Sequence, residues 1–224
     1  SNGLGKSRLR KKRFLKENSD LRYAEFNKKF INTRYPIIGV RLPTLQKFAK
    51  EIEPEYIEFD ENLSHEEIML YIYCAGCFKT EDEQLEYLQN ILPYIDNWAT
   101  CDCTGALKKL KGEKSFQFFS NLLKSDKEFE VRVGIIGFMK NFLKTGKLNE
   151  ILAQIKEIKS DAYYVKMGIS WFYAELCAFN SELAVEEIKK TQDKFIRNKS
   201  ISKAKESFRV SATTKAELEK LRMK

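Results

Sequence analysis

The 224-residue sequence contains only four prolines and ten glycines. A β-sheet protein with many tight turns usually needs more of both, because these residues supply the backbone angles that turns require. Leu, Lys, Glu, Ile and Phe dominate the composition, which suits helices. With 43% hydrophobic residues, the chain is too apolar to be disordered. The composition therefore predicts an all-α fold.

The sequence lacks an apolar segment long enough to cross a membrane. Its longest apolar run, Ile68–Phe78, covers about half of the roughly 20 residues that a spanning helix needs. No signal peptide is recognisable. Residues 1–5 are expected to be a tag remnant or a disordered end, and residues 1–224 to form one domain. We expect no membrane partner and a cytoplasmic, nucleoid-associated protein.

The five cysteines, an odd number, do not form a disulfide framework, which indicates a reduced protein. Cys74 and Cys77, together with Cys101 and Cys103, have spacings that would allow a four-thiolate zinc site. The first pair lies in a helical pattern without the glycine-rich turn that such sites favour. We therefore interpret the cysteines as small buried residues and expect no metal and no cofactor.

Histidine occurs only once, as His65 in the segment SHEE. We predict that His65 lies on the surface and that the acidic segments HEE and EDEQLE face solvent.

Acidic residues are outnumbered: 40 lysines and arginines against 32 aspartates and glutamates give a net charge of +8. This excess favours an acidic partner such as nucleic acid, although many basic proteins bind none. The cations cluster in residues 6–16 and 194–209. Each cluster alone is interpreted most simply as a solvated helix face.

Apolar residues recur with helical spacing along most of the chain. Ser64 with Glu67, and Thr80 with Glu83, form capping-box patterns, and Pro43 suits the first turn of a helix. We predict helices over residues 43–52, 64–78, 128–143, 147–158, 163–179, 181–191 and 197–207, with others after Thr80 and near the C-terminus. Six phenylalanines are expected between helices: Phe116, Phe118, Phe119, Phe138, Phe142 and Phe172.

Two segments repeat at an interval of 34 residues. Val131–Ile135 (VRVGI) aligns with Val165–Ile169 (VKMGI), and the same shift backward from Arg132 reaches Trp98. Such a period with helix pairs is typical of a HEAT-like α–α superhelix, a solenoid of antiparallel helix pairs. Trp98, Arg132 and Lys166 would then lie in one row, and an aromatic and cationic row suits a polyanion groove.

The segment DNWATCD, residues 96–102, places Trp98 and Asp102 four residues apart, so that both share one face of a helix. A single tryptophan in an amphipathic helix is usually part of the core, and a single aspartate is usually solvated. The pair becomes a candidate site because it belongs to the row that also contains Arg132 and Lys166.

Four segments together resemble the AlkD-type DNA alkylation repair family, which are HEAT-like-repeat DNA glycosylases. They are IIGVRLPTLQKFAKEI (37–52), DNWATCD (96–102), FEVRVGI (129–135) with YYVKMGISW (163–171), and NKSISKAKESFRVS (198–211). The resemblance covers nearly the whole chain. It implies a monomeric enzyme without cofactor whose partner is double-stranded DNA containing alkylated purines.

The resemblance also implies site residues. Trp98, Asp102 and Trp171 would surround the deoxyribose of the damaged nucleotide as the catalytic group, with Arg132 beside them. Tyr23 looks like an aromatic residue of the family in an early helix. We assign DNA contacts to Arg132, Lys166, Tyr23, Arg41, Lys199 and Lys203.

Arg41 either reaches a phosphate or pairs with a neighbour, and Gly39 before it is expected in a turn. Family members often have aspartate directly after the first tryptophan, and some have arginine three residues after the second. Here these positions are Ala99 and Ala174, and the missing charges bear on substrate range and rate more than on the fold.

The implied chemistry is consistent with these residues. An N3- or N7-alkylated purine is cationic and leaves without protonation, so no general acid is required. Its loss leaves positive charge on the sugar, which Asp102 would stabilise while it orients water. Two alternatives stay open: a non-catalytic DNA-binding protein of the same family, and a HEAT-type protein–protein scaffold.

Overall fold

The computed structural model describes residues 2–55, 59 and 62–224. Within these residues the chain forms thirteen α-helices and two short 3-10 helices, and no strand. The prediction of an all-α fold is confirmed for this part of the chain. The chain divides into two compact units, Ser1–Ser115 and Phe116–Lys224, with the division inside helix α7.

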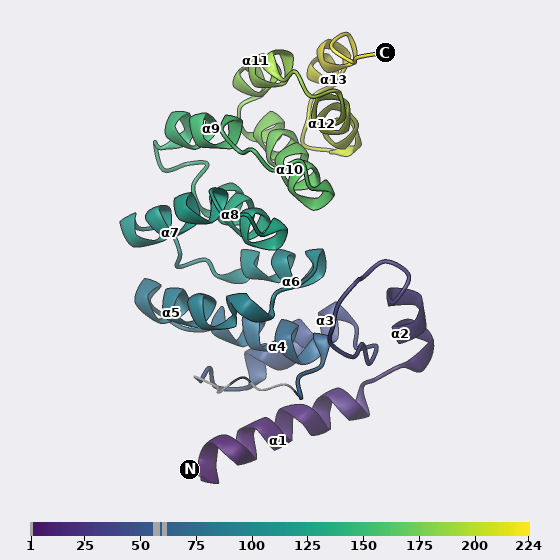
Figure 1. Cartoon of the computed structure of the whole chain (residues 1–224), viewed down its shortest axis with the longest axis vertical. Helices are drawn as coiled ribbons and strands as arrows, with labels where there is room; N and C mark the ends of the chain where they lie inside the picture. Colours follow the sequence, from purple (N-terminus) through teal and green to yellow (C-terminus); the bar gives the residue numbers. More distant parts are fainter. Residues whose placement is uncertain (1, 56–58, 60–61) are drawn as a thin grey trace. The chain divides into compact units, whose positions relative to one another are not determined.

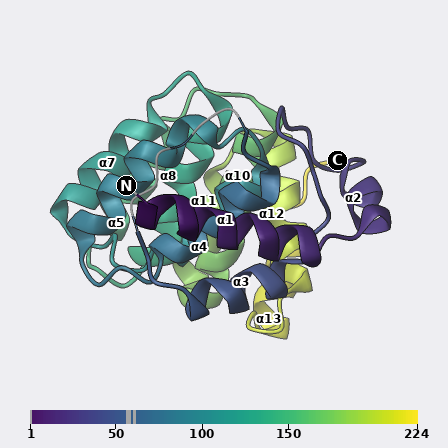
Figure 2. The same ribbon diagram turned by 90° about the horizontal axis from the view of Figure 1, so that it is seen from below.

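The first unit is built around α4, which packs against α1, α3, α5 and α6. Helix α1 lies along α4 in both views (Figures 1 and 2). The elements of this unit are α1 (Asn2–Glu17), α2 (Leu21–Asn27), α3 (Leu42–Glu51), α4 (His65–Ala75), α5 (Glu81–Ile91), η1 (Leu92–Tyr94), α6 (Trp98–Cys103), η2 (Thr104–Ala106) and the start of α7 (Glu113–Leu123).

The second unit is built around α10, which packs against α8, α11 and α12. Figure 1 shows α8, α10 and α12 following one another, each preceded in the chain by another helix. The elements are the rest of α7, α8 (Glu128–Asn141), α9 (Leu148–Lys156), α10 (Tyr163–Phe179), α11 (Ser181–Lys190), α12 (Lys194–Glu206) and α13 (Ala212–Glu219).

The repeated segments occupy equivalent places in this second unit. Val131–Ile135 lies near the start of α8, and Val165–Ile169 lies near the start of α10. The glycine in the second copy, Gly168, lies where an added Cβ would contact Ile135 and the Arg132 stem at 3.4 and 3.7 Å. The repeat therefore lies where α8 and α10 pack against each other.

Most of the phenylalanines expected between helices are there. Phe116, Phe119, Phe138, Phe142 and Phe172 are buried, whereas Phe118 is half-buried. Four of these rings form edge and tilted contacts between α7 and the end of α8, with centroids 5.2–6.3 Å apart.

The predicted helix starts agree with the structure. Ser64 accepts a hydrogen bond from the Glu67 N–H, and Thr80 accepts one from the Glu83 N–H. Pro43 lies in the first turn of α3. The helix predicted from residue 197 starts earlier, at Lys194, because the Asp193 carboxylate caps it by accepting from the Ile196 N–H.

The prediction that the segment HEE faces solvent was wrong, because both carboxylates are buried. The Glu67 carboxylate pairs with Arg8 at 3.3 Å and Lys12 at 3.1 Å and accepts from the Tyr71 hydroxyl, which fastens α1 to α4. The Glu66 carboxylate accepts from the N–H groups of residues 38–40. The partners lie far away in sequence, so local reading missed them. In EDEQLE, by contrast, the acidic residues are exposed or half-buried, and Gln84 and Leu85 are buried.

Gly39 lies in the turn that was expected there, with a φ of 86°. A Cβ at this position would lie 2.0 Å from the Asp20 carbonyl oxygen and 2.8 Å from the Ala24 nitrogen. Only glycine combines this backbone conformation with so close an approach. The turn joins the start of α2 to the residues that lead into α3.

Gly39→Ala should destabilise the protein by on the order of 2–4 kcal/mol, because left-handed strain and a backbone clash add. Gly146→Ala is the matched control: Gly146 has a φ of 81° but no atom within 4 Å of an added Cβ. It should cost only the strain, about 1 kcal/mol. Urea denaturation midpoints of the two variants measure the difference, and equal losses would contradict the close approach at Gly39.

Candidate functional site

The first two residues of DNWATCD build the start of α6. The Asn97 side-chain oxygen accepts from the Ala99 N–H at 2.9 Å and the Thr100 N–H at 3.2 Å, which caps the helix. The Asp96 carboxylate accepts from the Thr33 hydroxyl at 2.7 Å. These polar contacts fix the position at which α6 begins.

Trp98 and Asp102 lie on the helix that Asn97 caps. Both are half-buried and line one cleft of about 560 Å³ in the first unit. The Trp98 indole N–H donates to the Phe30 carbonyl at 3.0 Å, which fixes the ring plane. We call this the Trp98 cleft; its lining includes Tyr23, Phe30, Leu42, His65, Trp98 and Asp102.

Three of the predicted site residues therefore share one cleft: Tyr23 from α2, and Trp98 and Asp102 from α6. Much of the remaining lining is aromatic or aliphatic, and it includes Phe26 and Phe30, which are both exposed. A carboxylate on an apolar, aromatic wall suits a flat or sugar-like ligand with positive charge.

Arg41 pairs with a neighbour, which is one of the two outcomes expected for it. Its guanidinium lies 3.1 Å from the Asp20 carboxylate and 4.7 Å from the centre of the Tyr23 ring. The Tyr23 N–H and Arg41 hold the pKa of Asp20 below its usual range. Arg41 is exposed, and its contact with phosphate stays a prediction.

His65 also lines the cleft and is buried, so the prediction that it lies on the surface was wrong. Its Nδ1 lies 3.4 Å from the Asn97 side-chain nitrogen. The Asn97 oxygen is used by the α6 cap, so the nitrogen is the donor and Nδ1 of His65 the acceptor. Burial lowers the pKa of His65, against the opposing effect of Glu66 and Asp96. The neutral imidazole thus supports the cap of α6.

In the second unit, Arg132, Trp171 and Tyr164 form a cluster. The Arg132 Nη1 donates to the Tyr164 carbonyl at 2.9 Å, and its guanidinium lies 5.8 Å from the Trp171 ring centre. Arg132 is only 6% exposed, so most of its side chain is packed within the second unit. Ala99 and Ala174 occupy the two positions at which the family resemblance led us to expect a charged side chain, and both are buried.

The remaining predicted DNA contacts lie on α10 and α12. Lys166 pairs with Asp193 at 2.8 Å, and this contact holds the pKa of Asp193 below its usual range. Lys199 lies 5.8 Å from the centre of the Phe195 ring and lines a shallow hollow on α12. Lys203 is half-buried on the same helix. The contacts of these lysines with DNA stay predictions.

Sequence reasoning missed Lys140, whose amine lies 5.0 Å from the Trp171 ring centre. Lys140 follows Arg132 by two helical turns on α8, so helical spacing alone would have placed both on one face. It also missed Asn97, although asparagine two and three residues before the N–H groups that it caps is a local helix-start pattern, and Glu66, whose partners lie far away in sequence.

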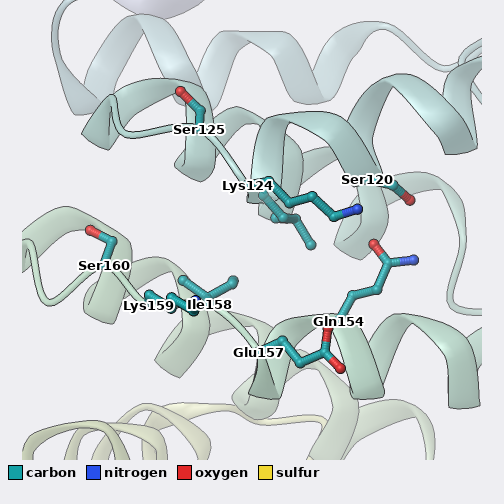
Figure 3. Close-up of a pocket in the computed structure, with 9 residues that line it drawn as sticks. Ser120, Lys124, Ser125, Gln154, Glu157, Ile158, Lys159 and Ser160 are labelled. Carbon is teal, nitrogen blue, oxygen red and sulfur yellow. The ribbon is translucent and has the colours of Figure 1, made fainter.

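A different cleft of about 500 Å³ lies in the second unit at the ends of α7 and α9 (Figure 3). Ser120, Lys124, Gln154 and Glu157 line it, and Ser120 Oγ and Gln154 Oε1 are buried without a hydrogen-bond partner in the protein. It contains none of the predicted site residues and no aromatic ring. It is therefore the weaker candidate for the predicted chemistry.

The cysteines agree with the interpretation as small buried residues. Four of the five are buried, and burial raises the pKa of the Cys74, Cys103 and Cys177 thiols to about 12. Cys77 is half-buried. Among the described residues, no group of His, Cys, Asp and Glu has the arrangement of a metal site. In the same part of the chain, no helix is both long and apolar enough to span a membrane.

His65 predicts a specific pH dependence. Its pKa is lower in the folded protein than in the unfolded chain, so its contribution to stability is full above about pH 6.5 and is lost as pH falls from there toward the folded pKa. Protonation would also place two donors against each other at Asn97. The melting temperature should therefore fall between pH 7.5 and pH 5.

Because His65 is the only histidine, this titration has one assignment. The control is His65→Gln, which should flatten the dependence over the same range. A parent protein whose melting temperature is constant from pH 7.5 to 5 would contradict the buried, neutral His65.

One comparison of the sequence with known protein families gives a match. A family model described as DNA alkylation repair enzyme matches residues 12–208, which contain every predicted site residue. Neither a curated protein nor a solved structure gives a significant match. Since the matched residues make up most of the sequence, the chain belongs to the DNA alkylation repair enzyme family.

Proposed function

We propose that the protein is a monofunctional DNA glycosylase that excises cationic N3- and N7-alkylated purines from duplex DNA. The observation that carries the proposal is the Trp98 cleft, where Trp98, Asp102 and Tyr23 come together in a member of a DNA alkylation repair family. We further propose that the helix pairs form a HEAT-like superhelix, that the protein is a monomer, and that it works in the cytoplasm on the nucleoid.

The leaving group explains why one carboxylate is sufficient. An N3- or N7-alkylated purine already has a positive charge, so the bond to the sugar breaks without a proton donor. Positive charge then develops on the deoxyribose, as in glycoside cleavage. Asp102 stabilises this charge electrostatically and orients or deprotonates the attacking water.

The aromatic lining has a separate role. The Trp98 ring, fixed by its hydrogen bond to the Phe30 carbonyl, packs against the sugar and favours the developing cation through its π face. From the family resemblance we propose the same role for Trp171, whose ring has Arg132 and Lys140 beside it. The duplex is positioned by cationic side chains that contact its phosphates, namely Lys166, Lys199, Lys203 and Arg41.

Asp102→Asn retains the size of the side chain but removes its charge. Excision of 3-methyladenine and 7-methylguanine should fall by roughly 10²-fold or more, which is about 2.7 kcal/mol of lost transition-state stabilisation. DNA affinity should hold or rise slightly, because an anion near phosphate is gone. Single-turnover base release measures the rate, and thermal melts check the fold.

Asp126→Asn is the control for this change, since Asp126 is an exposed carboxylate in the second unit outside the Trp98 cleft. It should excise at the parent rate. Equal rates for Asp102→Asn and Asp126→Asn would exclude Asp102 from catalysis. A parent protein that binds DNA but releases neither base would instead favour the non-catalytic DNA-binding protein.

Lys199→Gln tests the phosphate contacts. It should weaken binding to duplexes of different sequence to a similar extent and lower the slope of log affinity against log salt by about 1. Lys79→Gln removes an exposed lysine that has no assigned DNA contact, and its salt slope should equal that of the parent. A parent protein with no salt-dependent duplex binding would favour the protein–protein scaffold.

A further inference from the structure

The cleft of about 500 Å³ at the ends of α7 and α9 is lined by a buried serine with an unused hydroxyl. Ser120 is only 8% exposed, and its Oγ forms no hydrogen bond with the described residues. A serine inside a helix can donate to the carbonyl four residues earlier. Ser170 and Ser200 form this bond, at 2.8 and 2.6 Å. The Ser120 hydroxyl is therefore available to a molecule that enters the cleft.

Gln154 on α9 presents an acceptor to the same cleft. Its Oε1 is buried and accepts no hydrogen bond from the part of the chain that the structure describes. Gln84, a buried glutamine in the first unit, shows the usual arrangement, because its nitrogen donates to two carbonyls and its Oε1 accepts from the Lys109 N–H at 2.9 Å. Since buried polar atoms are normally hydrogen-bonded, the Gln154 oxygen points to a ligand with an N–H or O–H donor.

Two oppositely charged side chains lie at the same cleft. Lys124 comes four residues after Ser120, and Glu157 comes three residues after Gln154. Spacings of three and four place each charge on the helix face of the polar group before it. Figure 3 shows the Lys124 amine and the Ser120 hydroxyl on the side of the cleft that faces the Gln154 amide. Both charged residues are exposed, so they form the rim above the buried polar atoms.

The rest of the wall is partly apolar. Leu123 is buried, Ile158 is half-buried, and both line the cleft. Ser125 and Ser160 also line it, but their hydroxyls already form hydrogen bonds within the chain. A volume of about 500 Å³ with an apolar wall and a few polar groups is typical of a site for a small molecule.

We propose that this cleft binds a small zwitterion with an apolar body: a free α-amino acid with an apolar side chain, or a dipeptide with the same groups. The ligand's carboxylate accepts from the Ser120 hydroxyl and pairs with Lys124. Its ammonium donates to Gln154 Oε1 and pairs with Glu157, while its side chain packs against Leu123.

The pairing of signs distinguishes this ligand from others. A simple anion such as a phosphate would face the Glu157 carboxylate and would bring no donor to Gln154. A simple cation would face Lys124 and would bring no acceptor to Ser120. The cleft contains none of the residues assigned to catalysis or to DNA, so the binding site does not depend on the proposed glycosylase.

The test titrates the isotope-labelled full chain with L-leucine and L-leucyl-L-leucine at millimolar concentration, and it follows the NMR signal of the Gln154 side-chain amide. At least one of the two should shift this signal, and the one that binds more tightly identifies the source as a free amino acid or a short peptide. N-Acetyl-L-leucine lacks the ammonium and L-leucinamide lacks the carboxylate. Each should bind roughly 10-fold or more weakly than L-leucine.

Gln154→Met removes the acceptor and retains the length of the side chain, and Ser120→Ala removes the hydroxyl. Calorimetry should show binding of the tighter ligand weakened by about 10- to 100-fold in each, the range expected for one lost hydrogen bond to a charged group. Glu157→Gln tests the ammonium contact at the exposed rim, where folding is not at risk, and should also weaken binding. Gln192→Met, at an exposed glutamine outside the cleft, is the control and should bind like the parent.

Three results would overturn the assignment. The first is a parent protein whose Gln154 signal responds to neither L-leucine nor the dipeptide. The second is equal affinity for L-leucine, N-acetyl-L-leucine and L-leucinamide, because the cleft would then not distinguish the charges. The third is binding that survives unchanged in Gln154→Met, Ser120→Ala and Glu157→Gln, which would place the ligand elsewhere on the protein. None of these measurements involves base release, so they stand apart from the test of the glycosylase.

Discussion

The candidate site depends on the hydrogen bonds of the Asn97 side-chain amide. One buried side chain caps α6 through two backbone N–H groups and donates to the neighbouring Asp96 carboxylate, and its nitrogen faces the neutral His65 ring. The direction of α6 determines where Trp98 and Asp102 point. A site whose reacting groups lie on a short helix needs such support, because small displacements cost much of the catalytic effect. In DNWATCD, the first two residues therefore build the scaffold and the later ones line the cleft.

Two buried carboxylates in the first unit also help to fix the position of the candidate site. The Glu66 carboxylate accepts hydrogen bonds from three backbone N–H groups at the turn around Gly39. The Glu67 carboxylate forms ion pairs with cations of α1, which joins α1 to α4. A buried carboxylate is tolerated only when its oxygens are hydrogen-bonded or paired. These contacts hold the segment that leads into α3, including Val40 and Leu42 of the cleft wall, against the helix that bears His65. Part of the basic character of residues 6–16 is thus used within the protein.

Local patterns predicted the helices well, because capping residues and apolar spacing act over a few positions; Ser64, Thr80 and Pro43 are examples. The pairing of Trp98 with Asp102 also follows from spacing alone. His65, Glu66 and Glu67 were misjudged because polar type predicts exposure unless a partner is known, and their partners include residues far away in sequence. Helical spacing from Arg132 would have been sufficient to find Lys140, whereas the ion pair of Arg209 with Glu175 depends on the fold.

The central claim is that Asp102 stabilises positive charge on the deoxyribose, and affinity for a mimic of that charge tests it most directly. A duplex with a cationic pyrrolidine in place of the sugar resembles the transition state, and one with neutral tetrahydrofuran is its control. The parent should bind the pyrrolidine duplex at least about 10²-fold more tightly, and Asp102→Asn should lose most of that preference. Equal affinity of the parent for both duplexes, or a preference that survives in Asp102→Asn, would contradict the account.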